Sequence, residues 1–257
     1  MTTEPLLAVH KLAVTIAGIN VCEELDFSVA RGECWAILGR NGAGKTTLLH
    51  TLAGLRAPAA GSIHIDSHPL ASLTARELAR VRGLLPQDDF DTFPATVLET
   101  ALIGRHPHLS RWQWEGPADV SIARAALAAV DIDDAEARDV RTLSGGERRR
   151  VALATLLAQQ PQLFLLDEPA SHLDLSHQFG LLNGLTALVR DQHKALIMVL
   201  HDVNLAARYC DHALLLERGS ALAGPAEELL TAQRLSRLYG VTLKTLRDEG
   251  RRVFVAD

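Results

Sequence analysis

The segment GRNGAGKTT at residues 39–47 constrains the fold of this chain more than any other feature. It follows an apolar run at residues 34–38 (CWAIL), typical of a buried strand, and opens a helical pattern that runs from residue 44 to about residue 53. In this order of strand, loop and helix, glycines let backbone N–H groups surround phosphate oxygens. The match to the pattern G-x-x-x-x-G-K-[ST] is carried by Gly39, Gly44, Lys45 and Thr46. The sequence therefore predicts an α/β fold that binds a nucleotide.

The side chains of this loop have separate expected roles. Lys45 supplies positive charge to the β- and γ-phosphates, and the Thr46 hydroxyl can ligate Mg²⁺. A chance glycine-rich turn is the alternative, and the flanking strand and helix patterns argue against it. The residues expected to bind ATP are Gly39, Arg40, Asn41, Gly42, Ala43, Gly44, Lys45, Thr46 and Thr47.

The stretch LFLLDEP at residues 163–169 is an apolar strand pattern that ends in two acidic residues. We expect Asp167 to hold Mg²⁺, directly or through water, and Glu168 to polarise an attacking water as the catalytic base. Acidic residues also occur at solvent-facing strand ends without a function. The phosphate-binding loop in the same chain favours the functional interpretation.

Two more polar residues follow apolar runs. His201 lies in MVLHD at residues 198–202, and Gln87 ends GLLPQ at residues 83–87. Ligands of open α/β sheets bind at the carboxyl ends of the strands. We therefore expect His201 to contact the γ-phosphate, and Gln87 to sense Mg²⁺ or the attacking water. A structural histidine and an ordinary Pro-Gln turn are the alternatives.

The stretch TLSGGERRR at residues 142–150 indicates a second anion-binding turn. Ser144 and Glu147 have the spacing of a capping box, so we expect a helix to begin here. Gly145 and Gly146 in its first turn weaken a helix. They are accounted for if an anion such as phosphate approaches the bare N–H groups of the helix N-terminus.

Composition narrows the class of protein. The net charge is −5, so the basic surface of a nucleic-acid binder is not expected, and the run Arg148–Arg150 is interpreted as a solvated helix face. The three cysteines form no CxxC pair, which indicates neither zinc nor a disulfide framework and favours a reducing cytosol. No apolar run approaches the roughly 20 residues that a membrane-spanning helix needs.

The motifs occur in the order found in ABC-type ATPases, and the chain resembles that family over nearly its whole length. In this family two ATPase domains pair head to tail, and the LSGGE turn of one caps the γ-phosphate held by the other. The resemblance implies that Ser144, Gly145 and Gly146 bind a partner's nucleotide. It also implies that Asp174 lies at the dimer seam and that a homodimer completes two sites. The motifs are the phosphate-binding loop, Gln87, LSGGE, LLDEP, ASHLD at residues 170–174, and His201.

The resemblance also implies a domain organisation. We expect an ABC ATPase domain over residues 4–240, with a mostly parallel, RecA-like α/β core at about 4–87 and 160–240 that includes an N-terminal antiparallel β region. A helical subdomain is expected at about 88–159, and residues 241–257 would be a C-terminal extension packed on the core. The local patterns behind this division are strands at 6–9, 12–16 and 62–66 and helices at 74–80, 96–103, 119–130 and 145–159.

Three stretches resemble the subfamily that serves importers of iron-siderophores, haem and cobalamin. They are ALIGRHPHLSRWQW at 101–114, HLDLSHQ at 172–178 and HDVNLAARYCDHALLLERG at 201–219. Membership implies two membrane permease subunits, an indirect link to a substrate-binding protein, no nucleic acid, and a peripheral position on the cytoplasmic face of the inner (plasma) membrane. An exporter or lipid-moving subunit and a soluble, non-transport ABC ATPase are the alternatives.

Aromatic residues give two further expectations. Trp112 and Trp114 either contact the permease or pack locally, and the sequence does not decide between these. The family commonly stacks adenine on an aromatic side chain near the place of Ile16, but residues 1–26 contain no Phe, Tyr or Trp. We therefore hypothesise poor selectivity between ATP and GTP.

Overall fold

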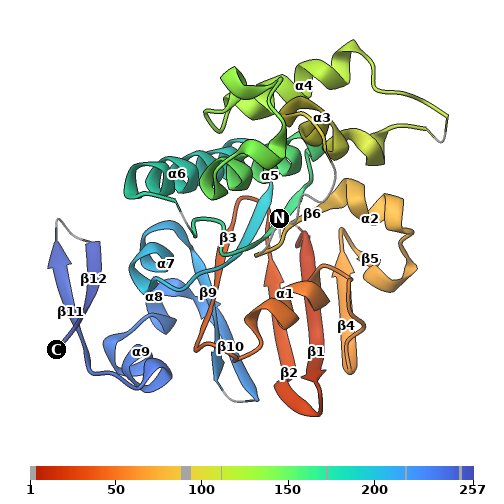
Figure 1. The fold of residues 1–257 in the computed structure, drawn as a ribbon. Coiled ribbons are helices and arrows are strands. Elements are labelled where there is room, and N and C mark those ends of the chain that lie inside the picture. Colours follow the sequence, from red (N-terminus) through yellow and green to blue (C-terminus); the bar gives the residue numbers. More distant parts are fainter. Residues whose placement is uncertain (1–3, 88–93, 111, 172, 218, 249–250) are drawn as a thin grey trace.

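The computed structural model describes residues 4–87, 94–110, 112–171, 173–217, 219–248 and 251–257. Its centre is a six-stranded sheet (Figure 1). Strands β3, β6, β7, β8 and β9 run parallel to one another, and β10 is antiparallel to β9. Strands β3, β7 and β8 are buried at every residue, as their continuous apolar sequences predict. In spatial order the strands are β10 (Ser220–Pro225), β9 (His212–Glu217), β3 (Cys34–Gly39), β8 (Ala195–Val199), β7 (Leu163–Asp167) and β6 (Arg82–Leu85).

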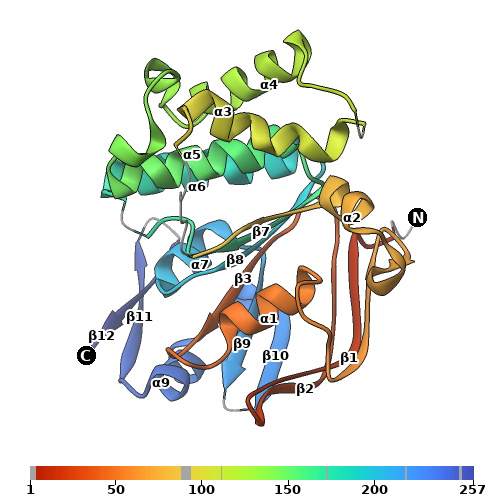
Figure 2. The ribbon, with the colours of Figure 1, turned by 45° about the vertical axis from the view of Figure 1, so that its right-hand side comes forward.

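The two faces of this sheet belong to two apolar cores. Because strand residues alternate between faces, Phe164 and Leu166 enter the core formed with the helices between residues 97 and 209. Leu163 and Leu165 enter the other core, which contains helix α1 and an N-terminal sheet (Figure 2). This mixed α/β architecture with a mostly parallel sheet confirms the expected fold class. The helices on the two faces include α1 (Lys45–Leu52), α5 (Gly145–Gln159), α6 (Leu175–Asp191) and α7 (Val203–Tyr209).

The N-terminal sheet is antiparallel, as expected, but differs from the sequence prediction in its details. The patterns at 6–9 and 12–16 form one strand with a register shift between Val9 and Leu12, where Lys11 has a φ of 43°. Strand β2 was not predicted, because its acidic, half-exposed sequence INVCEELDFSV lacks a clean alternation. The sheet order is β2 (Ile19–Val29), β1 (Leu7–Ile16), β4 (Ala60–Ile65) and β5 (His68–Pro69), and η1 (Leu70–Ser72) and α2 (Ala75–Val81) follow it.

A helical layer covers the α5 side of the central sheet (Figure 1). The helix predicted at 145–159 is observed with those bounds, and the helices predicted at 96–103 and 119–130 begin and end within two residues of them. Residues 88–93, the first part of the expected helical subdomain, lie outside the described residues. The outer elements are α3 (Val97–Leu102), η2 (Ile103–His108), α4 (Pro117–Ala128), η3 (Asp133–Ala135) and η4 (Val140–Thr142).

The GRHPH stretch forms η2 and fastens this layer. Arg105 is buried and donates to Asp119 on α4 at 3.0 Å and to the Ala158 carbonyl on α5 at 2.8 Å. A Cβ on Gly104 would lie 2.1 Å from the Thr155 carbonyl oxygen, so only glycine allows this close contact between η2 and α5. The segment that carries the subfamily resemblance therefore has a structural role.

The C-terminal residues pack against the core through α7. The Asn204 side chain bonds both backbone groups of Phe254, whose ring is buried. The elements of this region are α8 (Ala226–Leu229), α9 (Ala232–Tyr239), β11 (Leu243–Asp248) and β12 (Arg251–Ala256).

All three cysteines are buried. Burial raises the pKa of Cys22 to about 11 and that of Cys34 to about 12, and it also raises the pKa of Cys210.

Candidate active site

The phosphate-binding loop connects β3 to α1, as predicted. Gly44 caps α1 with a φ of 92°, a left-handed conformation that L side chains rarely adopt. A Cβ at this position would also lie 2.6 Å from both methyl groups of Val21. The conformation and the contact each favour glycine at this position of the loop.

Lys45 lies at the centre of this loop. Its side chain is buried, and Nζ donates to the carbonyl oxygens of Gly39 at 3.0 Å and Arg40 at 3.2 Å. Burial lowers the pKa of the ammonium, and the carboxylates of Glu168 and Asp167 oppose part of that change. A cation is thus held beside two acidic side chains, in a loop whose backbone suits phosphate.

Asp167 ends β7 and is fully buried. Neither carboxylate oxygen has a hydrogen-bond partner among the described residues. Burial raises the pKa of this carboxyl, and the Thr46 hydroxyl lies close enough to lower it in part without a well-formed hydrogen bond. Unsatisfied buried oxygens beside a hydroxyl are a donor set that fits Mg²⁺, which prefers oxygen ligands.

Glu168 and His201 meet at the carboxyl ends of β7 and β8. His201 Nε2 lies 2.5 Å from Glu168 Oε1. The Glu168 backbone has a φ of 49°, which is uncommon for a residue other than glycine and is typical of functional sites. Its N–H donates to the Val199 carbonyl at 3.2 Å, which attaches it to the neighbouring strand. The structure thus brings the two expected catalytic side chains into contact.

Arg149 corrects the interpretation of the basic run at 148–150 as a solvated helix face. Its side chain is only 7% exposed, whereas Arg148 and Arg150 are half-buried. Its position four residues before the buried Leu153 places it on the inner face of α5, and this spacing could have identified it. Its guanidinium donates to the carbonyl oxygens of Pro86 at 2.5 Å, Gln87 at 3.4 Å, Asp167 at 2.6 Å and Glu168 at 3.1 Å.

Gln87 joins the site through its backbone. It follows β6, and its carbonyl shares the Arg149 guanidinium with the carbonyls of Asp167 and Glu168. Its side chain is exposed. The ends of β6, β7 and β8 therefore converge at one edge of the sheet.

The LSGGE turn begins α5 with the predicted capping box. Ser144 Oγ accepts from the Glu147 N–H at 3.3 Å, and Glu147 Oε2 accepts from the Ser144 N–H at 2.7 Å. A Cβ on Gly145 would meet no atom within 4 Å. Among the described residues, no hydrogen bond or ion pair joins this turn to the phosphate-binding loop. One copy of the chain thus gives no steric reason for glycine at position 145.

Asp174 caps helix α6. Its Oδ1 accepts from the His177 N–H at 2.9 Å and from the Ser176 hydroxyl at 2.8 Å, and these bonds lower its pKa to about 2. The carboxylate remains about two-thirds exposed. Its expected place at a dimer seam is compatible with this exposure.

A pocket of about 960 Å³ lies beside the phosphate-binding loop and could hold the base and ribose. Ile16 and Ile19 are 38% and 68% exposed on its wall, and Arg237 of α9 lines another side. None of the residues described as lining it is aromatic. The position where the family commonly has an adenine-stacking aromatic residue is therefore part of an open, aliphatic wall.

The comparison with protein families decides the class. The family model for ABC transporters matches residues 22–171. The chain belongs to the ABC transporter family. ATP-binding subunits of ABC transporters hydrolyse ATP, and the recognised motifs identify the chain as such a subunit. Within the described part of the chain, no helix combines the length and apolar character needed to cross a membrane.

Individual relatives are ATP-binding proteins of hemin import and of ferric enterobactin transport. Hemin import ATP-binding protein HmuV from Nocardia farcinica is 43% identical over 221 residues, 86% of this chain and 76% of HmuV. Ferric enterobactin transport ATP-binding protein FepC from Escherichia coli K12 is 39% identical over 243 residues, 93% of this chain and 89% of FepC. A solved structure described as an inward-facing ABC transporter of metal-chelate type has a TM-score of 0.86 and 27% identity, with 98% of each chain covered.

Proposed function

We propose that this ABC ATPase energises uptake of a bulky metal chelate, either hemin, a ferric siderophore or cobalamin, through a separate membrane permease. The observation that carries the proposal is the similarity to hemin and ferric enterobactin ATP-binding proteins over most of the chain. The GRHPH stretch, which forms η2, supports the same subfamily.

Nucleotide binding would fall to the loop at residues 39–47. Its N–H groups would surround the phosphates, and Lys45 would exchange its bonds to loop carbonyls for bonds to phosphate oxygens. Thr46 and Asp167, with Gln87 nearby, would hold Mg²⁺, for which the unsatisfied oxygens of Asp167 are suited. When bound, Mg²⁺ would neutralise phosphate charge during phosphoryl transfer.

Hydrolysis would use the pair at the ends of β7 and β8. Glu168 would accept a proton from the attacking water, and His201 would orient that carboxylate and contact the γ-phosphate. The side chain of Glu168 is 16% exposed and that of His201 47%, so the pair is reachable from the surface where the phosphates would lie. Gln87 would report the occupied site to the permease.

A homodimer would complete each site. Ser144, Gly145 and Gly146 of one copy would cap the γ-phosphate on the partner copy, with Asp174 at the seam. The open space around Gly145 supports this arrangement. We expect Ser144→Arg to bind ATP but to lose hydrolysis, because the larger side chain would fill that space. Full ATPase activity in this variant would contradict the shared site.

The permease would dock between the core and the helical layer, on the cytoplasmic face of the membrane. Two permease subunits and, indirectly, a substrate-binding protein would complete the importer. Trp112 and Trp114 are 88% and 86% exposed beside η2, which favours an interface over local packing. Hydrolysis in the dimer would move the docked permease.

The experiment measures uptake of labelled hemin, a labelled ferric siderophore and labelled cobalamin. The cells carry the wild-type gene or a variant gene as their only copy of the gene for this protein. The variants are the wild type, Glu168→Gln, and Glu228→Gln as a control with an exposed glutamate on α8. We expect Glu168→Gln to abolish uptake of one compound and Glu228→Gln to retain it. Normal entry of all three compounds with Glu168→Gln would refute the importer function and favour an exporter or a soluble ATPase.

A further inference from the structure

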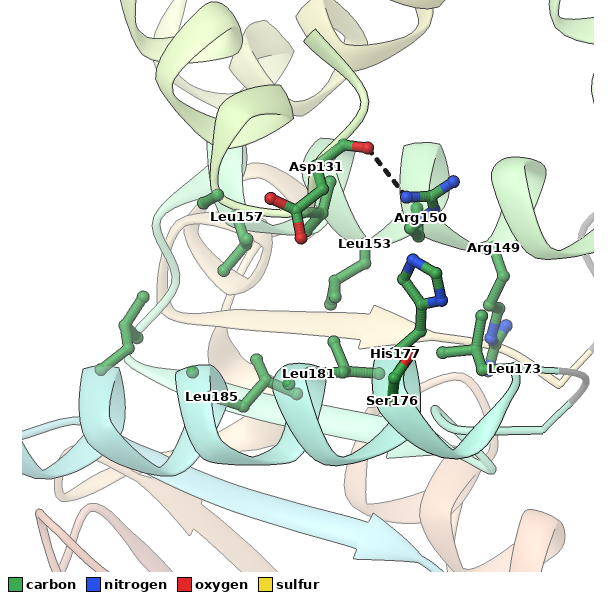
Figure 3. A pocket seen from close by; sticks show the side chains of 15 residues that line it. Asp131, Arg149, Arg150, Leu153, Leu157, Leu173, Ser176, His177, Leu181 and Leu185 are labelled. Atoms are coloured by element: carbon green, nitrogen blue, oxygen red, sulfur yellow. Dashed lines mark hydrogen bonds between the residues drawn. The ribbon is translucent and has the colours of Figure 1, made fainter.

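Arg149 connects the helix that begins at LSGGE to the two strand ends that carry the acidic residues. It lies in the second turn of α5, and its side chain extends out of the helical layer toward Leu173 (Figure 3). One planar guanidinium bonds two backbone segments, Pro86–Gln87 and Asp167–Glu168. A buried charge is costly unless its donors are satisfied, and here carbonyl oxygens accept from both terminal nitrogens of the guanidinium.

These bonds act on the backbone from which the expected catalytic side chains project. Glu168 has a left-handed backbone, which persists only where its surroundings fix it. The bond from its N–H to Val199 holds one side of the residue, and the bond from Arg149 to its carbonyl holds the other. Loss of the guanidinium would free the peptide that directs the Glu168 carboxylate.

The opposite end of α5 has a comparable tie far from the acidic residues. Gln159 Nε2 donates to the carbonyl of Ala79 on α2 at 2.5 Å and to that of Arg82, the first residue of β6, at 2.9 Å. Between α5 and α6 lies a pocket of about 360 Å³, lined by Leu153, Leu157, Leu181 and Leu185 (Figure 3). Packing between α5 and α6 therefore leaves a gap, and the polar ties of Arg149 and Gln159 attach α5 to the strand ends and to α2 and β6 instead.

We propose that Arg149 is a positioning residue for hydrolysis. It holds the Asp167–Glu168 segment in place and makes the position of that segment depend on the position of α5. The inference rests on the proposed role of Glu168 as the base. A shift of α5, which begins at the LSGGE turn, would be transmitted through one side chain to the base and to the backbone of Gln87. In this role the guanidinium contacts neither the nucleotide nor the attacking water.

The test measures ATP affinity, KM and kcat for the purified full-length chain and its Arg149→Met and Arg149→Lys variants. We expect Arg149→Met to lower kcat about 100-fold, the size of effect that a misplacement of about 1 Å produces, with ATP affinity within about threefold of the wild type. Arg149→Lys should recover part of kcat, because an ammonium keeps the charge but cannot bond both segments at once.

Gln159→Met is the matched control, since it removes the tie at the other end of α5. It should lower the melting temperature as Arg149→Met does, yet leave kcat within about threefold of the wild type. A kcat for Arg149→Met equal to that of Gln159→Met would overturn the proposal, as would a parallel loss of ATP affinity. If Arg149→Met does not fold, Arg149→Lys decides: a wild-type kcat in that variant overturns the proposal.

A double variant separates this inference from the proposed function. If Arg149 acts through Glu168, Glu168→Gln combined with Arg149→Met should be no slower than Glu168→Gln alone. A near-wild-type rate for Glu168→Gln would refute both the base and the positioning role. A slow Glu168→Gln beside a fast Arg149→Met would refute the positioning role alone.

Discussion

The central sheet and the helical layer are held by different kinds of contact. Strands β3, β7 and β8 are buried at every residue and are apolar apart from Asp167 at the end of β7. The layer above adds buried polar ties, in which Arg105 and Arg149 donate to backbone carbonyls. Apolar burial is non-directional, whereas a hydrogen bond fixes a direction. The difference indicates a core that resists deformation and a layer whose position depends on a few specific bonds.

The largest expected effect tests the core side of this comparison. Phe164 on β7 is fully buried, so Phe164→Ala should lower the free energy of unfolding by about 4 kcal/mol through lost burial and a cavity. Urea denaturation measures it. Leu246→Ala, at a side chain that is 54% exposed, is the control and should change stability by less than about 0.5 kcal/mol. A similar loss of unfolding free energy in both variants would contradict the view that apolar burial holds the central sheet.

The next effect tests the layer. Arg105→Met leaves the carboxylate of Asp119, whose side chain is only 13% exposed, without its cation and should cost about 3 kcal/mol. The loss should be local, with faster amide hydrogen exchange in η2 and α4 and unchanged exchange in β3 and β8. Arg124→Met removes an exposed pair with Glu136 and should cost less than about 1 kcal/mol. Equally accelerated exchange in the sheet would show that the layer is not an independent unit.

A smaller effect concerns the pocket at the edge of the core. Ile16→Tyr would supply an aromatic surface for the base and should strengthen ATP binding by about 1 kcal/mol, or about fivefold. The wild type should turn over ATP and GTP at similar rates, and kcat should not change in the variant. Calorimetric titration with both nucleotides measures the binding. A strong preference of the wild type for ATP would contradict the hypothesis of poor base selectivity.

The smallest effect is a pH dependence within the layer. The capping-box bonds with Ser144 and the contact with Arg138 lower the pKa of Glu147 from its usual 4.5 to about 2. A lowered acid pKa stabilises the fold above the unfolded pKa, and this contribution disappears as the pH falls from about 4.5 toward about 2. The difference in unfolding free energy between the wild type and Glu147→Gln, below about 1 kcal/mol at pH 6, should therefore shrink in acid.

The capping box at Glu99 provides the control for this pH dependence. Its carboxylate makes the same bonds with Thr96, which lower its pKa, and no ion pair is described for it. The difference in unfolding free energy between the wild type and Glu99→Gln should also shrink in acid, but by a smaller amount than for Glu147→Gln. A difference that grows as the pH falls would contradict the assignment for Glu147.

Sequence patterns predicted the features whose causes are local. The strand–loop–helix at residues 34–53 and the helix at 145–159 follow from apolar periodicity, glycine placement and a capping box. Strand β2 escaped prediction because its pairing with β1 compensates for a polar sequence. The burial of Arg149 could have been predicted from its spacing to Leu153, but its partners could not, because Pro86 and Asp167 are distant in sequence and accept through backbone carbonyls. Side-chain sequence carries no signal for such partners.

The burial of all three cysteines has a practical consequence for labelling. A buried, protonated thiol reacts slowly with alkylating reagents, so the folded native chain should stay unmodified by maleimide dyes. A single introduced thiol, as in Trp112→Cys or Gly145→Cys, would then be the one that reacts. Fluorophores at these two points would follow the approach of a permease or of a second copy in real time, with every native cysteine kept in place.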